Sequence, residues 1–199
     1  MIISHRGNGF GYLENSTEAL IEAYMHPNSD GKDFDIQLTK DKIPVIFHDE
    51  KITERTCSQC EFHGRAIGDI YFHDLPKLLK GVNLPSLEWF LNSLEKAIYK
   101  LKCSGNRIKY IDAEIKESDA RIVETYELVE PIITRFISSI DDPSNSSGLR
   151  CVCVYSSFCS DNSIIKYLSD KNYYSNIMVV SESKDEYTAR DIRHSFLDV

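Results

Sequence analysis

The sequence predicts an α/β fold in which strands alternate with helices, as in a parallel sheet or a barrel. Short apolar runs with strand character alternate with longer segments of helical period, and turn residues separate them. No internal repeat or low-complexity tract interrupts the series. At 199 residues, 42% of them hydrophobic and 27% charged, the chain is expected to form one globular domain over residues 1–199.

The elements follow one another in a regular order. An apolar strand at residues 2–5 runs into a glycine-rich turn, and the helix after it can be capped by Asn15 or Ser16 and ends at Pro27. Residues 50–84 show no period and are expected to be irregular. Further strands are expected at residues 33–38, 44–48, 110–116, 151–156 and 176–180, and further helices at residues 87–101, 120–136, 161–168 and 186–194.

One of these expected helices contains a proline. Pro131 lies inside the segment expected to be helical at residues 120–136. Because proline lacks the backbone donor that a helix interior needs, we expect it to interrupt this helix or to divide it in two.

Two of the expected strands carry charged residues where a parallel strand should be apolar on both faces. Since side chains alternate along a strand, the charged residues share one face. These residues are Asp33, Asp35 and Gln37 in one strand, and Asp112, Glu114 and Lys116 in the other. If that face lines a barrel, a bound cation explains the converging carboxylates, and oxygen ligands favour Mg²⁺ or Ca²⁺ over zinc. On this pattern alone, solvent-facing strands of an antiparallel sheet remain an equal alternative.

Two histidines fall at strand ends. His5 ends the first expected strand and His48 the third. In a barrel both ends belong to the rim where active sites lie, and a pair of imidazoles there can serve as acid and base. The remaining histidines have no such context and are expected at the surface or in loops: His26, His63, His73 and His194.

Six cysteines raise the question of a metal or disulfide framework. Cys57 and Cys60 have zinc-ligand spacing, with His63 just beyond, but no second matching pair exists. Free thiols are therefore favoured over a structural zinc. Cys151 and Cys153 alternate with valines and are expected to act as small apolar residues in a buried strand.

The overall charge limits the partners. Acidic residues outnumber basic ones, 31 against 23, and no basic block occurs, which argues against nucleic-acid partners and anionic membrane surfaces. Neither a signal peptide nor an apolar run of about 20 residues is visible, so a cytoplasmic protein without membrane insertion is expected.

Several short motifs occur in an order that resembles the glycerophosphodiester phosphodiesterase family. They are His5-Arg6-Gly7, Glu14-Asn15-Ser16, Asp33-Phe34-Asp35, Gln37-Leu38-Thr39-Lys40-Asp41, Pro44-Val45-Ile46-Phe47-His48-Asp49, Arg55-Thr56, Leu84-Pro85-Ser86-Leu87-Glu88, Glu114-Ile115-Lys116 and Ser157-Phe158. The resemblance implies a TIM-type (β/α) barrel that hydrolyses glycerophosphodiesters to an alcohol and glycerol phosphate. Carried over by position, it implies catalytic His5 and His48, phosphate-binding Arg6 and Lys116, and one Mg²⁺ or Ca²⁺ held by Asp33, Asp35 and Glu114.

The chain departs from the family in two respects. Asp33 stands where the family usually has glutamate. A full barrel has eight strands and typically about 250 residues, whereas about six strands are visible here, so we expect a shortened barrel whose last strands are missing or reduced. Pairing with another copy, as a homodimer, is one way to cover the open edge. Two other interpretations are a non-catalytic relative that binds metal and phosphate, and a lipid phosphodiesterase of the phospholipase D-toxin type.

Overall fold

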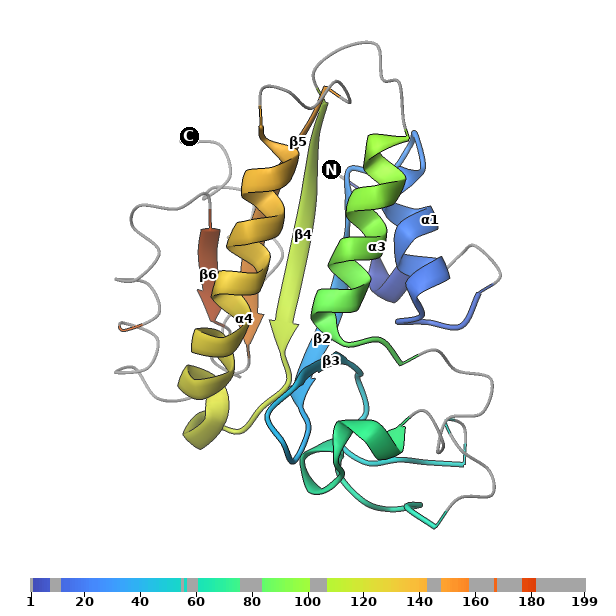
Figure 1. The fold of residues 1–199 in the computed structure, drawn as a ribbon, viewed down its shortest axis with the longest axis vertical. Coiled ribbons are helices and arrows are strands. Elements are labelled where there is room, and N and C mark those ends of the chain that lie inside the picture. The colour runs from blue at the N-terminus through green and yellow to red at the C-terminus, as the bar shows by residue number, and fades with distance from the viewer. Residues whose placement is uncertain are drawn as a thin grey trace.

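The computed structural model describes residues 2–7, 12–54, 56, 61–75, 84–100, 107–142, 148–157, 167 and 177–181. Within these residues six strands form one sheet in the order β1-β2-β4-β5-β6, with β3 beside β2 (Figure 1). The strands are β1 Ile3–Ser4, β2 Gly31–Leu38, β3 Pro44–Ile46, β4 Arg107–Ile115, β5 Leu149–Ser157 and β6 Ile177–Ser181. The predicted alternation of strands and helices is thereby confirmed as far as the structure describes the chain.

Helices cover one face of this sheet, as Figure 1 shows for α4 in front of β5 and for α3 in front of β2. The helices are α1 Thr17–Met25, α3 Leu87–Tyr99 and α4 Asp119–Ile140, and the short 3-10 helices are η1 His5–Gly7, η2 Ile67–Asp69 and η3 Phe72–Asp74. Serine side chains cap two of them, since Ser16 accepts from the Ala19 amide and Ser86 from the Trp89 amide.

The expectation that Pro131 breaks its helix was wrong, because α4 continues through it to Ile140. Pro131 lies on the exposed side of α4, where solvent can replace the missing donor. The opposite side buries Val129 and Ile133 in the core, and this packing favours a continuous helix.

The direction of β3 also differs from the expectation of parallel strands. All other described strand pairs are parallel, but β3 runs antiparallel to β2, with Ile36 opposite Ile46 and Leu38 opposite Pro44. Only residues 39–43 connect the two strands, and a parallel crossover needs a dozen or more residues. The chain therefore turns back, and this return brings residues 47–50 to the rim of the sheet.

The main core lies between the sheet and α1, α3 and α4. Phe34 of β2 packs edge-on against Phe90 of α3, with ring centroids 5.5 Å apart. Cys151 and Cys153 are buried there as free thiols, as predicted. Lys32 is also fully buried in this core, with Nζ 3.8 Å from the centroid of the Phe90 ring.

Residues 50–84 are irregular where they are described, as predicted, but they are not without a core. Val45, Phe47 and Ile52 pack with Ile67, Ile70 and Leu75 into a second apolar cluster. This cluster anchors the chain that follows β3, a role that the sequence pattern did not reveal.

Several expectations lie outside the described residues. They concern the turn at residues 8–11, residues 55, 57, 60, 103, 158, 159 and 194, and the two helices expected at 161–168 and 186–194, of which only Tyr167 is described. His63 and His73 lie at the surface, as expected, and His26 is half-buried. None of the helices in the described part of the chain combines the length and apolar character that crossing a membrane requires.

Candidate active site

Acidic side chains from two neighbouring strands meet near the carboxyl ends of the sheet. The parallel register of β2 and β4 places Asp33 beside Asp112 and Asp35 beside Glu114. Residues paired in this way project from the same face, so four carboxyl groups share one face of the sheet. This is the face opposite the apolar core, as the alternation of charged and apolar residues predicts.

The first strand contributes His5 and Arg6 through a tight turn. Arg6 and Gly7 both have positive φ, 51° and 69°. A Cβ atom on Gly7 would lie 2.6 Å from the backbone of Ala19, so only glycine fits between η1 and α1. The turn directs His5 and Arg6 back toward β2.

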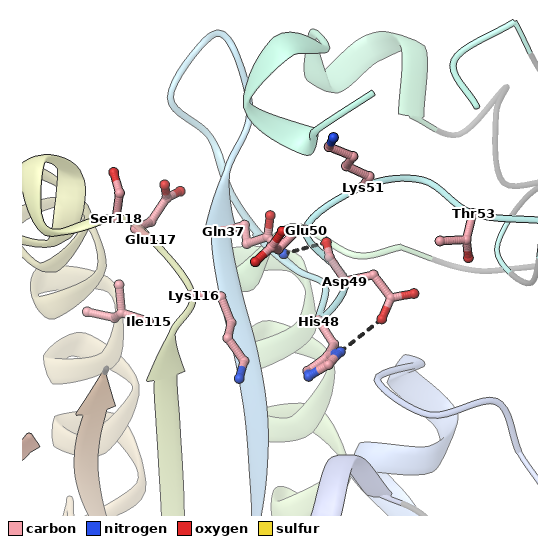
Figure 2. Close-up of a pocket in the computed structure, with 10 residues that line it drawn as sticks. All are labelled: Gln37, His48, Asp49, Glu50, Lys51, Thr53, Ile115, Lys116, Glu117 and Ser118. Carbon is pink, nitrogen blue, oxygen red and sulfur yellow. Dashed lines mark hydrogen bonds and ion pairs between the residues drawn. The ribbon is translucent and has the colours of Figure 1, made fainter. Parts of the chain in front are cut away.

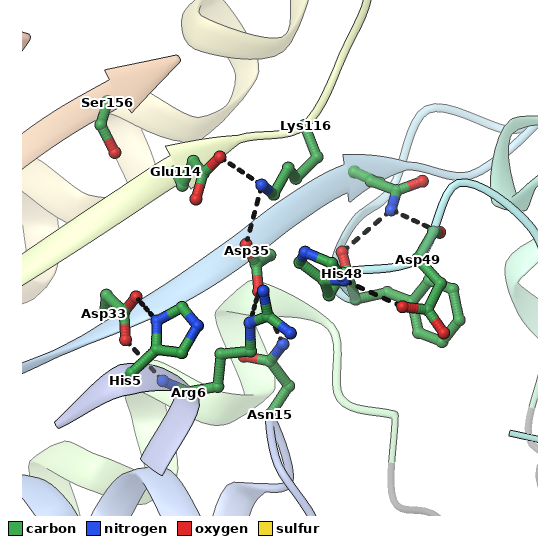
Figure 3. A network of polar contacts seen from close by, with 12 residues as sticks. His5, Arg6, Asn15, Asp33, Asp35, His48, Asp49, Glu114, Lys116 and Ser156 are labelled. Atoms are coloured by element: carbon green, nitrogen blue, oxygen red, sulfur yellow. Dashed lines mark hydrogen bonds and ion pairs between the residues drawn. The ribbon is translucent and has the colours of Figure 1, made fainter. Parts of the chain in front are cut away.

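Asp33 holds this turn in place with both carboxylate oxygens. Its Oδ2 lies 2.6 Å from His5 Nδ1, and its Oδ1 accepts from the Arg6 backbone amide at 2.5 Å. The His5 ring remains 64% exposed, so its other nitrogen is open to a bound molecule. Figure 3 shows His5 beside Asp33, with Arg6 extending between His5 and His48.

Asp35 is buried and takes contacts from three separate segments of the chain. Asn15 Nδ2 donates to Oδ2 at 2.8 Å, and Arg6 Nε lies 3.3 Å from the same oxygen. Lys116 Nζ lies 3.6 Å from Oδ1 and also forms an ion pair with Glu114. The two cap candidates thus have different roles. Ser16 caps α1, while Asn15, in a left-handed conformation, turns its amide toward Asp35.

The electrostatics of this face reflect crowded negative charge. Burial, together with the nearby Asp33, Glu114 and Asp35, raises the pKa of Asp112 to about 7, although Ser156 donates a hydrogen bond to it at 2.6 Å. Burial raises the pKa of Glu114 as well, and Asp35 adds to this while Lys116 opposes it. Like charges at this spacing favour the uptake of a proton or of a cation.

The donor set suits a hard divalent cation. Carboxylate oxygens are the ligands that such ions prefer, and each carboxylate has lone pairs beyond those used in the contacts above. Within the described residues, however, no three acidic, histidine or cysteine side chains already surround one point at ligand distance. Arg6 and Lys116 contact the carboxylates instead. Binding of a metal ion therefore requires these two side chains to move away from some of the carboxylate oxygens.

His48 reaches the same rim from β3. The Phe47 amide donates to the Asp35 carbonyl at 2.9 Å, and the His48 ring contacts Asp49 through Nδ1 at 2.9 Å. Beside His48 lies a pocket of about 960 Å³, lined by residues 48–51 and 115–118 and by Gln37 and Thr53 (Figure 2). Every residue that the motifs singled out for the site is thus near the rim formed by β1, β2 and β4, although β3 arrives in the opposite direction from the one expected.

The family model described as the glycerophosphoryl diester phosphodiesterase family matches residues 5–197. The chain belongs to this family.

Two curated relatives and one solved structure illustrate the relationship. The chain is 40% identical over 73 residues to "Lysophospholipase D GDPD3" of Homo sapiens, covering 37% of this chain and 21% of that protein. It is 30% identical over 117 residues to a glycerophosphodiester phosphodiesterase of Caldanaerobacter subterraneus subsp. tengcongensis, covering 58% of this chain and 45% of that protein. The chain therefore spans less than half the length of either relative.

The fold of the glycerophosphoryl diester phosphodiesterases is confirmed by a structure from Oleispira antarctica, a phosphodiesterase in complex with the product sn-glycerol-3-phosphate. It matches with a TM-score of 0.65 and 18% identity, covering 100% of this chain and 72% of that one. The expected fold class, a TIM-type barrel, is thereby confirmed, and the chain matches part of that structure's length.

Sequence reasoning assigned no role to several side chains at this site. Asp112 and Gln37 were visible on the charged strand faces, but Asp112 pairs with a residue distant in sequence and Gln37 binds backbone atoms. Asp49 follows His48 directly, but its contact with the ring was not foreseen. Ser156 had no signal beyond its place in an apolar strand. The residues whose contacts in the site come from the structure alone are Asn15, Gln37, Asp49, Asp112 and Ser156.

Proposed function

We propose that this chain hydrolyses glycerophosphodiesters to an alcohol and glycerol phosphate, as one domain over residues 1–199. The observation that carries the proposal is the meeting of His5 and His48 with in-register carboxylates of β2 and β4 at one rim. Membership in the family supports the same reaction. Asp33, Asp35 and Glu114 would hold one divalent cation, Mg²⁺ or Ca²⁺.

Charge explains how an acidic protein attracts an anionic substrate. The three proposed ligands and a divalent cation leave one negative charge, and Arg6 and Lys116 turn this into one positive charge. A phosphodiester monoanion is attracted to such a site.

The chemistry follows from the histidines. The glycerol hydroxyl next to the scissile ester attacks phosphorus, one histidine takes its proton, and the other protonates the departing alcohol. Water then opens the resulting cyclic phosphate while the two rings exchange roles. Arg6 and Lys116 orient the phosphate, and a cation bound at the carboxylates would stabilise charge on the phosphoryl oxygens.

A second candidate function is hydrolysis of a lysophospholipid, which the similarity to a lysophospholipase D favours. The test is choline release from glycerophosphocholine and from lysophosphatidylcholine, with Mg²⁺ or Ca²⁺ and with the phosphorus product identified. Our proposal predicts choline and glycerol phosphate from the first substrate and none from the second. Release from the lysolipid alone establishes the second function, and release from neither supports a binding protein without turnover.

A further inference from the structure

His48 lies outside regular structure, although the proposed reaction needs its ring at a fixed place. β3 ends at Ile46, so the ladder hydrogen bonds of the sheet stop before His48. An acid or base must stay within hydrogen-bond reach of the proton that it transfers. Other contacts therefore have to fix both its backbone and its ring.

Gln37 fixes the backbone. Its side chain is buried on the same face of β2 as Asp35. Nε2 donates to the carbonyl oxygens of Phe47 and of Asp49, both at 3.0 Å. These two residues stand on either side of His48, so one primary amide uses both of its N–H groups to hold the chain before and after the histidine.

Asp49 fixes the ring. Its Oδ1 lies 2.9 Å from His48 Nδ1, as the dashed line in Figure 2 marks. A carboxylate against Nδ1 favours the neutral tautomer that carries its proton on this nitrogen. The nitrogen left to exchange a proton with a substrate is then Nε2.

The two contacts support each other. The backbone carbonyl of Asp49 is held by Gln37, and the carboxylate of the same residue holds the ring. Because β2 carries both Gln37 and Asp35, the hydrogen bonds of Gln37 fix the His48 segment to the strand that bears the carboxylates. Phe47 anchors the same segment from the other side, since its ring is buried in the second apolar cluster.

We infer that Gln37 and Asp49 are positioning residues for His48: Gln37 sets the place of its backbone, and Asp49 sets the orientation and tautomer of its ring. The inference rests on the proposed function, because it gives His48 a proton to transfer. Neither residue needs to touch the substrate for this role.

Kinetics of matched variants test the inference. Gln37→Met keeps the length of the side chain but removes both donors, and Asp49→Asn keeps the size but removes the charge. Each is expected to lower kcat for glycerophosphocholine by about 10- to 100-fold, part of the contribution of acid–base catalysis, while KM stays within about twofold. Glu54→Gln is the control, because it removes an exposed carboxylate close by in the chain that does not line the pocket, and it should leave kcat unchanged.

A spectroscopic readout separates positioning from general stability. With ¹⁵N-labelled histidine, and with His48 assigned by comparison with His48→Gln, the neutral ring should carry its proton on Nδ1 in the wild type. Asp49→Asn should lose this preference, and Asp49→Glu should restore part of it. Thermal unfolding of each variant shows whether the protein is folded.

The outcomes for the two proposals are distinct. Folded Gln37→Met and Asp49→Asn variants with wild-type kcat, or a wild-type His48 ring protonated on Nε2, overturn the positioning inference. A wild-type protein that turns over no phosphodiester overturns the proposed function instead. In that case the tautomer of His48 in the wild type and in Asp49→Asn still decides whether Asp49 holds the ring.

Discussion

Asp35 of β2 and Glu114 of β4 lie side by side in the parallel sheet, and the Lys116 ammonium contacts both carboxylates. Lys116 is the cation that the two carboxylates share, and Arg6 adds a second cationic contact to Asp35. If both carboxylates are cation ligands, a divalent ion competes with Lys116 for the same oxygens.

Binding of the ion should therefore be visible without catalysis. A ligand at 100 times its Kd stabilises a protein by about 2.7 kcal/mol, which corresponds to several degrees in Tm at this size. We expect Mg²⁺ or Ca²⁺ to raise the Tm of the wild type and Asp35→Asn to abolish this shift, whereas Glu50→Gln retains it. A wild-type Tm that neither ion changes would count against the cation site.

Lys32 should destabilise the protein. It is fully buried among aromatic rings, and its Nζ has no hydrogen-bond partner among the residues that the structure describes. Burial lowers its pKa well below the usual value. Lys32→Met should raise the free energy of unfolding by about 1–3 kcal/mol, the cost of an unsatisfied buried polar group. Lys51→Met, at an exposed site, should change it little.

The pH dependence of this effect has a defined sign. Below its usual pKa the unfolded chain protonates Lys32, while the folded chain resists the proton, so wild-type stability falls as pH decreases from about 10. Urea unfolding should show that the advantage of Lys32→Met grows between pH 10 and pH 7. An advantage independent of pH would mean that the buried amine stays charged.

The raised pKa of Asp112 predicts that stability depends on pH in the opposite direction. Its pKa is about 7 in the folded protein, raised mainly by burial, and near 3.9 when unfolded. The folded state thus binds the extra proton between these values, and the stability that this supplies is lost as pH rises through 7. In EDTA, Asp112→Asn should remove this decline, whereas the exposed Asp69→Asn should not.

Gly7 and Gly64 form a matched pair for the turn that carries His5. Both have positive φ, 69° and 83°, so alanine at either position costs about 1–2 kcal/mol. At Gly7 the new Cβ meets the backbone of Ala19 at 2.6 Å, whereas at Gly64 no atom of the described part of the chain lies within 4 Å of it. Gly7→Ala should lower both Tm and phosphodiesterase activity strongly. Equal losses in Tm for the two variants would show that the turn at Gly7 can move.

Much of the sheet and the site could be predicted from the sequence, because the pattern along each strand is local. The alternation of charged and apolar residues at 33–38 and 110–116 shows which side chains share a face, and this placed Asp33, Asp35 and Glu114 together. The direction of β3 could not be read from its own residues, since an apolar strand looks the same either way. Only the short connection at residues 39–43 reveals that it runs antiparallel.

The positioning contacts were harder to predict. Gln37 binds backbone carbonyls, which leave no trace in the sequence. The choice between Asn15 and Ser16 as the cap of α1 depends on Asp35, a residue of another element that takes the Asn15 amide. The pKa of Asp112 depends on its neighbours across β2, which only the register of the strands defines.

The central claim is that His48 and the carboxylates of β2 and β4 together perform a cation-dependent phosphodiester hydrolysis. The most direct test measures hydrolysis of glycerophosphocholine and glycerophosphoethanolamine by the wild type and by His48→Ala, with Mg²⁺, with Ca²⁺ and with EDTA. We predict turnover in the wild type that requires one of the two cations and disappears in His48→Ala. Turnover that persists in EDTA or in His48→Ala, or a folded wild-type protein without any turnover, would contradict the claim.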